Sequence, residues 1–225
     1  MSGHFDSSEG LVVLPVYLVV DTSASLRGEI GLLNKAVAGF FRSIADDAVL
    51  ADMVKLCLIR FSSEATTVVP LSDPSAVSEV TSLVADGSTT YSAAFHLARQ
   101  EISADVADLK RQAYRVFRPL IFFMTDGAPT DPGWLAALEL LRSPQFALRP
   151  TIVAVGFGSA DPAIIGEIGS GRGGAFMISN IVGIREAIAS IWSALPAMLT
   201  ATVLSTRNPG EASAASVPPQ WLHLN

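Results

Sequence analysis

The stretch LPVYLVVDTSAS, at positions 14–25, decides the fold. Its apolar part reaches back to Leu11 and is short, continuous and rich in β-branched residues, which is typical of a strand covered on both faces in a parallel sheet. The apolar run stops abruptly at Asp21, and hydroxyl side chains follow it. We therefore expect a buried strand over 11–20 that delivers a polar loop to the edge of a sheet.

The rest of the chain alternates between apolar runs and helical periodicity. Strands are predicted at 54–61, 65–71, 119–125, 151–155 and 175–178. Helices are predicted at 29–46, 92–111 and 163–168, after Trp134 and from Ile184 onward, and a short helix is predicted within 73–84. The alternation predicts a doubly wound, Rossmann-like α/β/α sandwich with a mostly parallel six-stranded sheet. One edge strand should be antiparallel, because residues 62–64 are too few for a parallel crossover.

The composition indicates one compact domain with terminal extensions. The chain has 225 residues, of which 50% are hydrophobic and 16% charged, so it can bury a sizeable core. We expect an N-terminal extension over 1–10, a domain over 11–199 and a flexible tail over 200–225, where Ser, Ala, Pro and Asn accumulate. The apolar end of the tail, Pro218 to Leu222, would pack back on the domain, stay loose or serve as a docking peptide.

Several classes of protein are disfavoured. A net charge of −6 argues against a nucleic-acid binder. The single cysteine, Cys57, lies in an apolar run and is expected to be a buried strand residue rather than a nucleophile. The three histidines are scattered. Since residues 1–10 lack a basic region and no apolar run approaches about 20 residues, we expect no signal peptide, no membrane span and a cytoplasmic location.

Three polar loops should meet at one edge of the sheet. The loop from Asp21 to Ser25 follows the first strand, residues 88–90 precede a helix, and residues 125–127 follow the 119–125 strand. Ligands of open α/β sheets bind outside the carboxyl ends of the strands. Two carboxylates about 4 Å apart would repel by about 4 kcal/mol at an effective dielectric of 20, a penalty that a divalent cation turns into attraction. Hard oxygen ligands suit Mg²⁺, Mn²⁺ or Ca²⁺, and the helix beginning near Glu29 should favour the ionised form of Asp21.

Two glycine-rich segments are not expected to bind nucleotides. Residues 156–160 begin like a dinucleotide fingerprint, but Asp161 occupies the third glycine position and the segment comes late in the chain. Residues 169–174 lack the Lys-Ser/Thr of a phosphate-binding loop. Both are predicted to be ordinary loops.

The three loops together resemble the metal-ion-dependent adhesion site of von Willebrand factor type A domains. The resemblance covers roughly residues 14–199, and the segments 14–21 and 118–131 are similar to the TerY-like branch, the stand-alone A domains of bacterial tellurium-resistance and stress operons. It implies a metal held by five residues: the hydroxyls of Ser23, Ser25 and Thr89 bind it directly, and the carboxylates of Asp21 and Asp126 bind it directly or through water. Mg²⁺ is the cation expected first.

The sequence departs from the family pattern at three positions. Ala24, Ser88 and Ser92 stand where glycine is common. None of these changes removes an oxygen ligand, but they leave the register of the threonine loop open, so Thr90 is an alternative to Thr89.

Three functions are compatible with this sequence. The resemblance implies a non-enzymatic scaffold whose cation captures an acidic side chain of a partner protein, with kinase- or phosphatase-like proteins of the same operon as candidate partners. The alternative is an Mg²⁺-dependent phosphotransfer or phosphatase enzyme, but such phosphatases need a second acid two residues after the first, where this chain has Ser23. The third is a structural domain that binds no metal.

Overall fold

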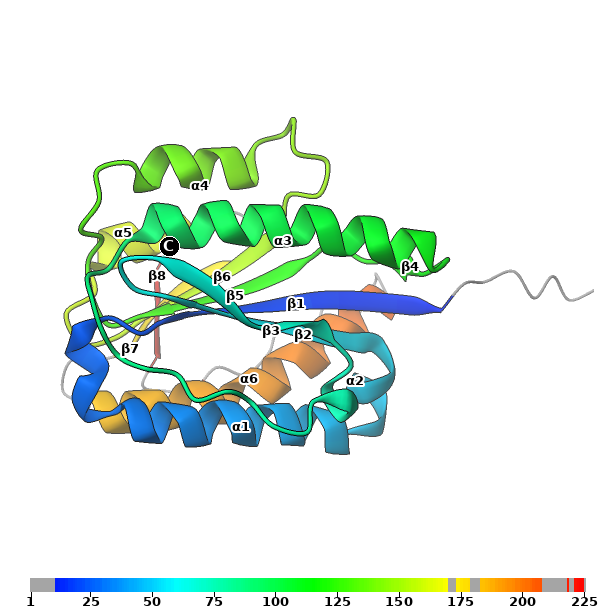
Figure 1. Cartoon of the computed structure of the whole chain (residues 1–225), viewed down its shortest axis with the longest axis horizontal. Coiled ribbons are helices and arrows are strands. Elements are labelled where there is room, and N and C mark those ends of the chain that lie inside the picture. Colours follow the sequence, from blue (N-terminus) through cyan, green and yellow to red (C-terminus); the bar gives the residue numbers. More distant parts are fainter. Residues whose placement is uncertain (1–10, 170–172, 179–182, 208–217, 219–220, 225) are drawn as a thin grey trace, which may run out of the picture.

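The chain folds into a central sheet between two layers of helices (Figure 1). The computed structural model describes residues 11–169, 173–178, 183–207, 218 and 221–224. The predicted extension over 1–10 and residues 170–172 of the 169–174 loop lie outside these residues.

The sheet has the strand order β3-β2-β1-β5-β6-β7-β8, with β4 paired to β1. Its strands are β1 (Val12–Asp21), β2 (Val54–Phe61), β3 (Ala65–Ser72), β4 (Arg115–Val116), β5 (Leu120–Thr125), β6 (Thr151–Gly156), β7 (Gly174–Ile178) and β8 (Trp221–Leu224). All neighbours pair in parallel except β3 on β2 and β8 on β7. The mostly parallel α/β class and the antiparallel β2–β3 hairpin are thus confirmed.

The helices divide between the two faces of the sheet. They are α1 (Ile30–Asp46), α2 (Ala48–Met53), α3 (Tyr91–Arg111), α4 (Trp134–Arg142), α5 (Pro162–Ile168) and α6 (Ile184–Arg207), with short 3-10 helices η1 (Ala24–Gly28) and η2 (Pro74–Ala76). Figure 1 shows α1, α2 and α6 on one face and α3, α4 and α5 on the other. Each face encloses a separate apolar core, because alternate residues of the buried strands point to opposite faces.

The prediction of a short helix within 73–84 was largely wrong. Only the single turn η2 forms there, and residues 77–84 run without regular structure along α1, where the Asn34 amide bonds both the backbone N–H (2.7 Å) and C=O (3.0 Å) of Leu83. This strap is held by a side chain rather than by helical hydrogen bonds. The sequence analysis also missed α2 and β4, both of which are short.

The C-terminal region is more structured than predicted. The proposed boundary at Thr200 falls inside α6, which continues to Arg207, and Trp221–Leu224 forms a strand that covers β7. The sheet therefore has eight strands instead of six, and β7 is not an edge. Residues 208–217 of the predicted flexible tail lie outside the described part of the chain.

The expectation that no apolar run approaches the length of a membrane span was wrong for α6. Its part from Ile184 to Leu204 is long and apolar enough to do so by length and composition, but half of its most apolar window is buried inside the domain. It packs against α1 as a core helix. Cys57, fully buried on β2, is a core residue as predicted, and burial raises the pKa of its thiol.

Candidate metal centre

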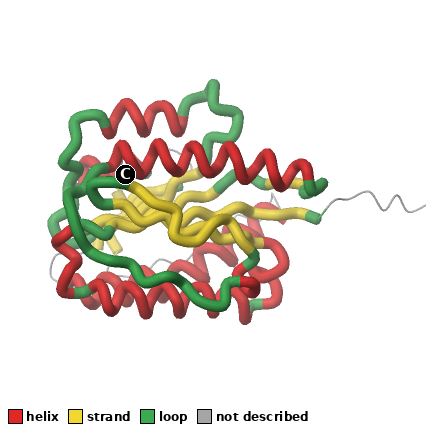
Figure 2. The backbone as a smooth tube through the Cα atoms, in the orientation of Figure 1, coloured by secondary structure: helices red, strands yellow, loops and turns green. Residues whose placement is uncertain are grey.

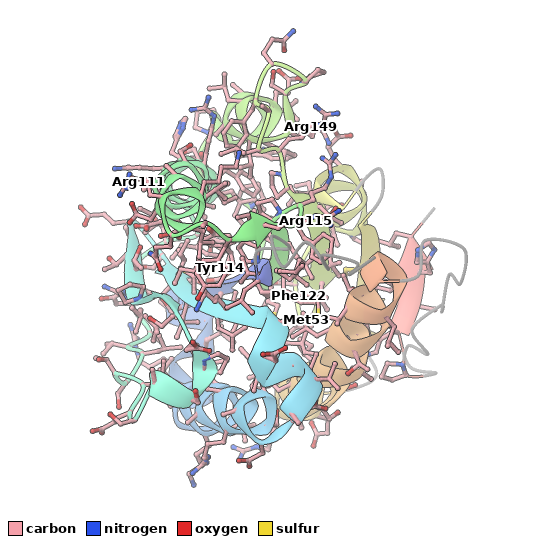
Figure 3. The ribbon with its side chains drawn as sticks, turned by 90° about the vertical axis from the view of Figure 1, so that its right-hand side faces the viewer. Met53, Arg111, Tyr114, Arg115, Phe122 and Arg149 are labelled. Carbon is pink, nitrogen blue, oxygen red and sulfur yellow. The ribbon has the colours of Figure 1, made fainter. Side chains whose placement is uncertain are left out.

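The candidate site lies at the carboxyl ends of β1 and β5, where the connections from these two strands lead toward opposite edges of the sheet. From β1 the chain crosses to β2 on one side, whereas from β5 it crosses to β6 on the other, and β1 and β5 are neighbours. The connections at the carboxyl ends of these strands gather at one end of the sheet (Figure 2). Figure 3 looks onto the opposite end, where the labelled Tyr114 and Arg115 lie near the amino end of β1. The predicted polar loops therefore share one end of the molecule.

Asp21 is the last residue of β1 and is almost completely buried. Its Oδ1 accepts a hydrogen bond from the backbone N–H of Ser23 (2.7 Å), and its Oδ2 accepts one from the Thr125 hydroxyl (2.5 Å). Desolvation nevertheless raises the pKa of Asp21 to about 6; hydrogen bonds from Thr125 and Ser23 oppose this effect, and the charge of Asp126 adds to it.

Two serines connect this loop to Asp126. Ser23 precedes the 3-10 helix η1, whose tight turn brings the Ser23 and Ser25 hydroxyls within 3.0 Å of each other. The Ser25 hydroxyl then donates to Asp126 Oδ1 at 2.9 Å. Burial raises the pKa of Asp126, while the hydrogen bond from Ser25 lowers it. Residues about a hundred positions apart in the sequence thus form one continuous group of oxygen atoms.

The threonine loop is attached to both of the other loops. The Ala24 N–H donates to Gly87 O (3.2 Å), the Asp86 N–H donates to Thr22 O (3.0 Å), and the Thr130 N–H donates to Thr89 O (2.9 Å). Gly87 has φ +67°, and a Cβ at this position would lie 2.4 Å from the Ser63 hydroxyl, so only glycine fits there. The loop is therefore held in one path beside the first and third loops.

Within this loop, Thr89 faces the candidate site and Thr90 does not. The Thr89 side chain is buried, and its hydroxyl lies 3.6 Å from the position that a Cβ on Gly127 would occupy, next to Asp126. The Thr90 hydroxyl instead lies 3.5 Å from that of Ser88, which in turn contacts the Ser63 hydroxyl. The geometry favours Thr89 of the two alternatives.

Three residues that support the loops were not predicted as site residues. Thr125 contacts Asp21 directly, and the Tyr91 hydroxyl donates to Gly127 O at 2.6 Å. The Asp131 carboxylate accepts from the backbone N–H groups of Tyr91 (2.8 Å) and Ser92 (3.3 Å), so it caps the start of α3 from another loop. An aspartate that caps a distant helix has no local sequence signal.

The donor set fits a hard divalent cation. Two buried carboxylates and three hydroxyls come together, and no cationic side chain within the described residues pairs with Asp21 or Asp126. No group of three or more His, Cys, Asp or Glu side chains that could hold a metal ion occurs among those residues, so a cation at this site would depend on the hydroxyls as well as on the two carboxylates. The site opens to solvent at Ser25, which is exposed. An oxygen-rich, net-negative site with an open side can hold Mg²⁺, Mn²⁺ or Ca²⁺ and leave room for a further ligand.

The family model of the von Willebrand factor type A domain matches residues 16–187 of this sequence, which is well over half of the chain. No curated protein matches the sequence.

Solved structures share the fold at low sequence identity. A pilus adhesin, SpaC of Lactobacillus rhamnosus GG, superposes with a TM-score of 0.63 at 15% identity, covering 87% of this chain and 30% of that one. Proximal thread matrix protein 1 of the mussel byssus, with a zinc-occupied MIDAS motif, gives 0.60 at 13% identity, covering 85% and 49%. The ArnB paralog VWA2 of Sulfolobus acidocaldarius gives 0.55 at 18% identity, covering 83% and 45%. The chain thus spans half or less of the length of these proteins.

Proposed function

Because this chain belongs to the von Willebrand factor type A family, we propose that it is a divalent-metal-dependent protein-binding module. Asp21, Ser23, Ser25, Thr89 and Asp126 would hold the cation, directly or through water. The bound cation supplies positive charge that attracts a carboxylate from a partner protein. A relative of the same fold is described with a zinc-occupied site of this type.

One observation carries the proposal: the hydroxyls of Ser23 and Ser25 and the carboxylate of Asp126 form a connected group with spacings of 2.9–3.0 Å at the carboxyl ends of β1 and β5. Buried carboxylates without a cationic partner cost free energy, and both acids of this site have raised pKa values. A cation would offset that cost. Because neutral hydroxyls make up much of the donor set, the bound cation would keep net positive charge and attract a further anionic ligand.

The finer assignment follows from the amino-acid sequence alone. We propose Mg²⁺ as the resident cation, a cytoplasmic location, and a TerY-like role in a tellurium-resistance or stress-response complex, with kinase- or phosphatase-like proteins of the same operon as partners. We propose no enzymatic activity, because Ser23 occupies the position at which a phosphoaspartate phosphatase needs its second acid.

The test is a selection of binding peptides. The immobilised chain is exposed to a random peptide library in Mg²⁺ or Mn²⁺, and bound peptides are eluted with EDTA. We expect the eluted peptides to share an Asp or Glu and to fail to bind an Asp21→Ala chain. Peptides that remain bound in EDTA, or that bind Asp21→Ala equally well, would show that the cation is not the binding element.

The phosphotransfer alternative is tested separately. The chain is incubated with acetyl phosphate or a generic phosphate ester in Mg²⁺, and phosphate release and protein phosphorylation are followed. We expect neither to exceed that of the Asp21→Ala chain. Turnover that disappears in this variant would favour the enzyme.

A further inference from the structure

The C-terminal strand β8 is attached to the domain much as a bound peptide would be. It pairs antiparallel with β7 over four residues, from Ala175↔Leu224 to Ile178↔Trp221. Trp221 provides the main side-chain anchor: it is 5% exposed, its indole N–H donates to the Ser190 hydroxyl of α6 at 2.9 Å, and its ring lies 5.6 Å from that of Phe176. Leu222, by contrast, is 59% exposed. Main-chain pairing plus one buried aromatic residue is the mode by which sheets bind added strands.

The connection from α6 to β8 is long, and it must return from the end of the helix to the Trp221 anchor beside Ser190. Ser190 lies 17 residues before the end of α6 at Arg207, so the helix carries the chain about 25 Å past the Trp221 anchor at 1.5 Å per residue. Figure 3 shows β8 beside α6. Thirteen residues, 208–220, separate Arg207 from Trp221, and their fully extended reach is about 50 Å. The segment can close within one chain, and it is also long enough to carry β8 away from its own domain.

We propose that the edge of β7 is a strand-addition site that accepts the C-terminal strand of a second copy of this chain, giving a reciprocally exchanged dimer. The second copy is the occupant because its residues 221–224 make the same four pairs and the same Trp221 contacts. Exchange therefore loses no contact that the monomer has. It goes beyond the proposed metal-dependent function and does not depend on it.

The length of the connection sets the balance between the two forms. A tethered segment is present at an effective concentration on the order of millimolar, so the full-length chain should be mostly monomeric at micromolar concentration. Deleting residues 208–217 leaves three residues before Trp221, whose reach of about 14 Å is shorter than the 25 Å return. This deletion should prevent closure within one chain and leave the pairing site itself unchanged.

The first experiment measures mass by light scattering at matched concentrations. We expect the chain lacking 208–217 to be a dimer, and a chain in which 208–217 is replaced by ten Gly/Ser residues to be a monomer. Adding Trp221→Ala to the shortened chain should return it to a monomer, whereas Leu222→Ala, at an exposed position, should not. A shortened chain that stays monomeric, or dimers that persist in Trp221→Ala, would overturn the proposal.

A second measurement tests the site without relying on the deletion. A labelled peptide of residues 218–225 is titrated against the full-length chain and against its Trp221→Ala variant, and fluorescence anisotropy is recorded. The variant, whose own strand lacks the anchor, should bind the peptide at least tenfold more tightly than the wild type. Equal affinity for the two proteins, or no binding to the variant, would contradict a strand-addition site at β7.

Discussion

Asp21, which is buried, and Asp105, which is half-buried, have similarly raised pKa values and different surroundings. Desolvation raises the pKa of both to about 6, and each accepts a hydrogen bond from a hydroxyl, from Thr125 in one case and Tyr17 in the other. Asp21 lies where three loops meet at the end of the sheet. Asp105 lies on α3 against the face of β1.

The difference is in what surrounds each carboxylate. Around Asp21, side chains from separate loops direct oxygen atoms toward one place, and the site opens at the exposed Ser25. Around Asp105, the hydroxyl of Tyr17 belongs to the core, and the nearby Glu101 is engaged by Thr67 at 2.7 Å. A raised pKa by itself reports burial, whereas convergent oxygen ligands with an open side indicate a binding site.

The largest expected difference between the two acids is the response to metal. Mg²⁺ or Mn²⁺ at 100 times its dissociation constant should raise the free energy of unfolding of the wild type by about 2.7 kcal/mol. For a domain of this size that corresponds to a thermal shift of about 5–10 °C. Asp21→Asn should lose this shift, and Asp105→Asn should keep it.

The comparison is made within each variant, with and without metal, so that changes in the stability of the metal-free protein cancel. If Asp21→Asn does not fold, Asp126→Asn takes its place. Equal shifts in Asp21→Asn and Asp105→Asn would remove the distinction between the two acids, and no shift in the wild type would support a domain that binds no metal.

A smaller effect is expected within the threonine loop. Thr89→Val and Thr90→Val each remove one hydroxyl with little change in volume. Because the Thr89 side chain is buried with its hydroxyl beside Gly127, whereas the Thr90 hydroxyl lies near Ser88, Thr89→Val should weaken metal binding about tenfold, or about 1.4 kcal/mol, while Thr90→Val should leave it nearly unchanged. Calorimetric titration of both variants measures this, and the reverse order of affinities would assign the ligand to Thr90.

The smallest effect concerns pH and Asp105. Its pKa is raised from 3.8 to about 6 in the folded state, chiefly by desolvation, so the folded protein holds a proton there that the unfolded chain has already released. The stabilising contribution of the protonated form is complete below about pH 4 and is lost as the pH rises to about 6. Relative to Asp105→Asn, the wild type should therefore lose about 0.5 kcal/mol across this range, since solvent screens a half-buried group.

Urea unfolding in EDTA at pH 4, 5, 6 and 7 provides the measurement. Asp21 titrates in both proteins, so its contribution cancels in the difference. A difference between wild type and variant that is constant with pH, or that grows in favour of the wild type as pH rises, would contradict the assignment to Asp105.

Much of the fold could be predicted because its signals are local. The run that ends at Asp21 and the stripe from Ile30 to Ile44 each reflect burial that a few neighbouring residues reveal. The errors fall where distant contacts decide the structure. The 77–84 strap depends on Asn34, and β8 depends on pairing with β7 and on a hydrogen bond from Trp221 to Ser190.

For the candidate site, the amino-acid sequence by itself determined the ligand chemistry: which carboxylates and hydroxyls follow the strands, and that they suit a hard cation. Only the tertiary structure decided that Thr89 rather than Thr90 lies buried beside Gly127, that Thr125 engages Asp21, and that Asp131 caps α3. The physical reason is that a sequence pattern reports the burial of neighbouring residues, whereas the direction of a loop side chain depends on hydrogen bonds to residues far away in the chain.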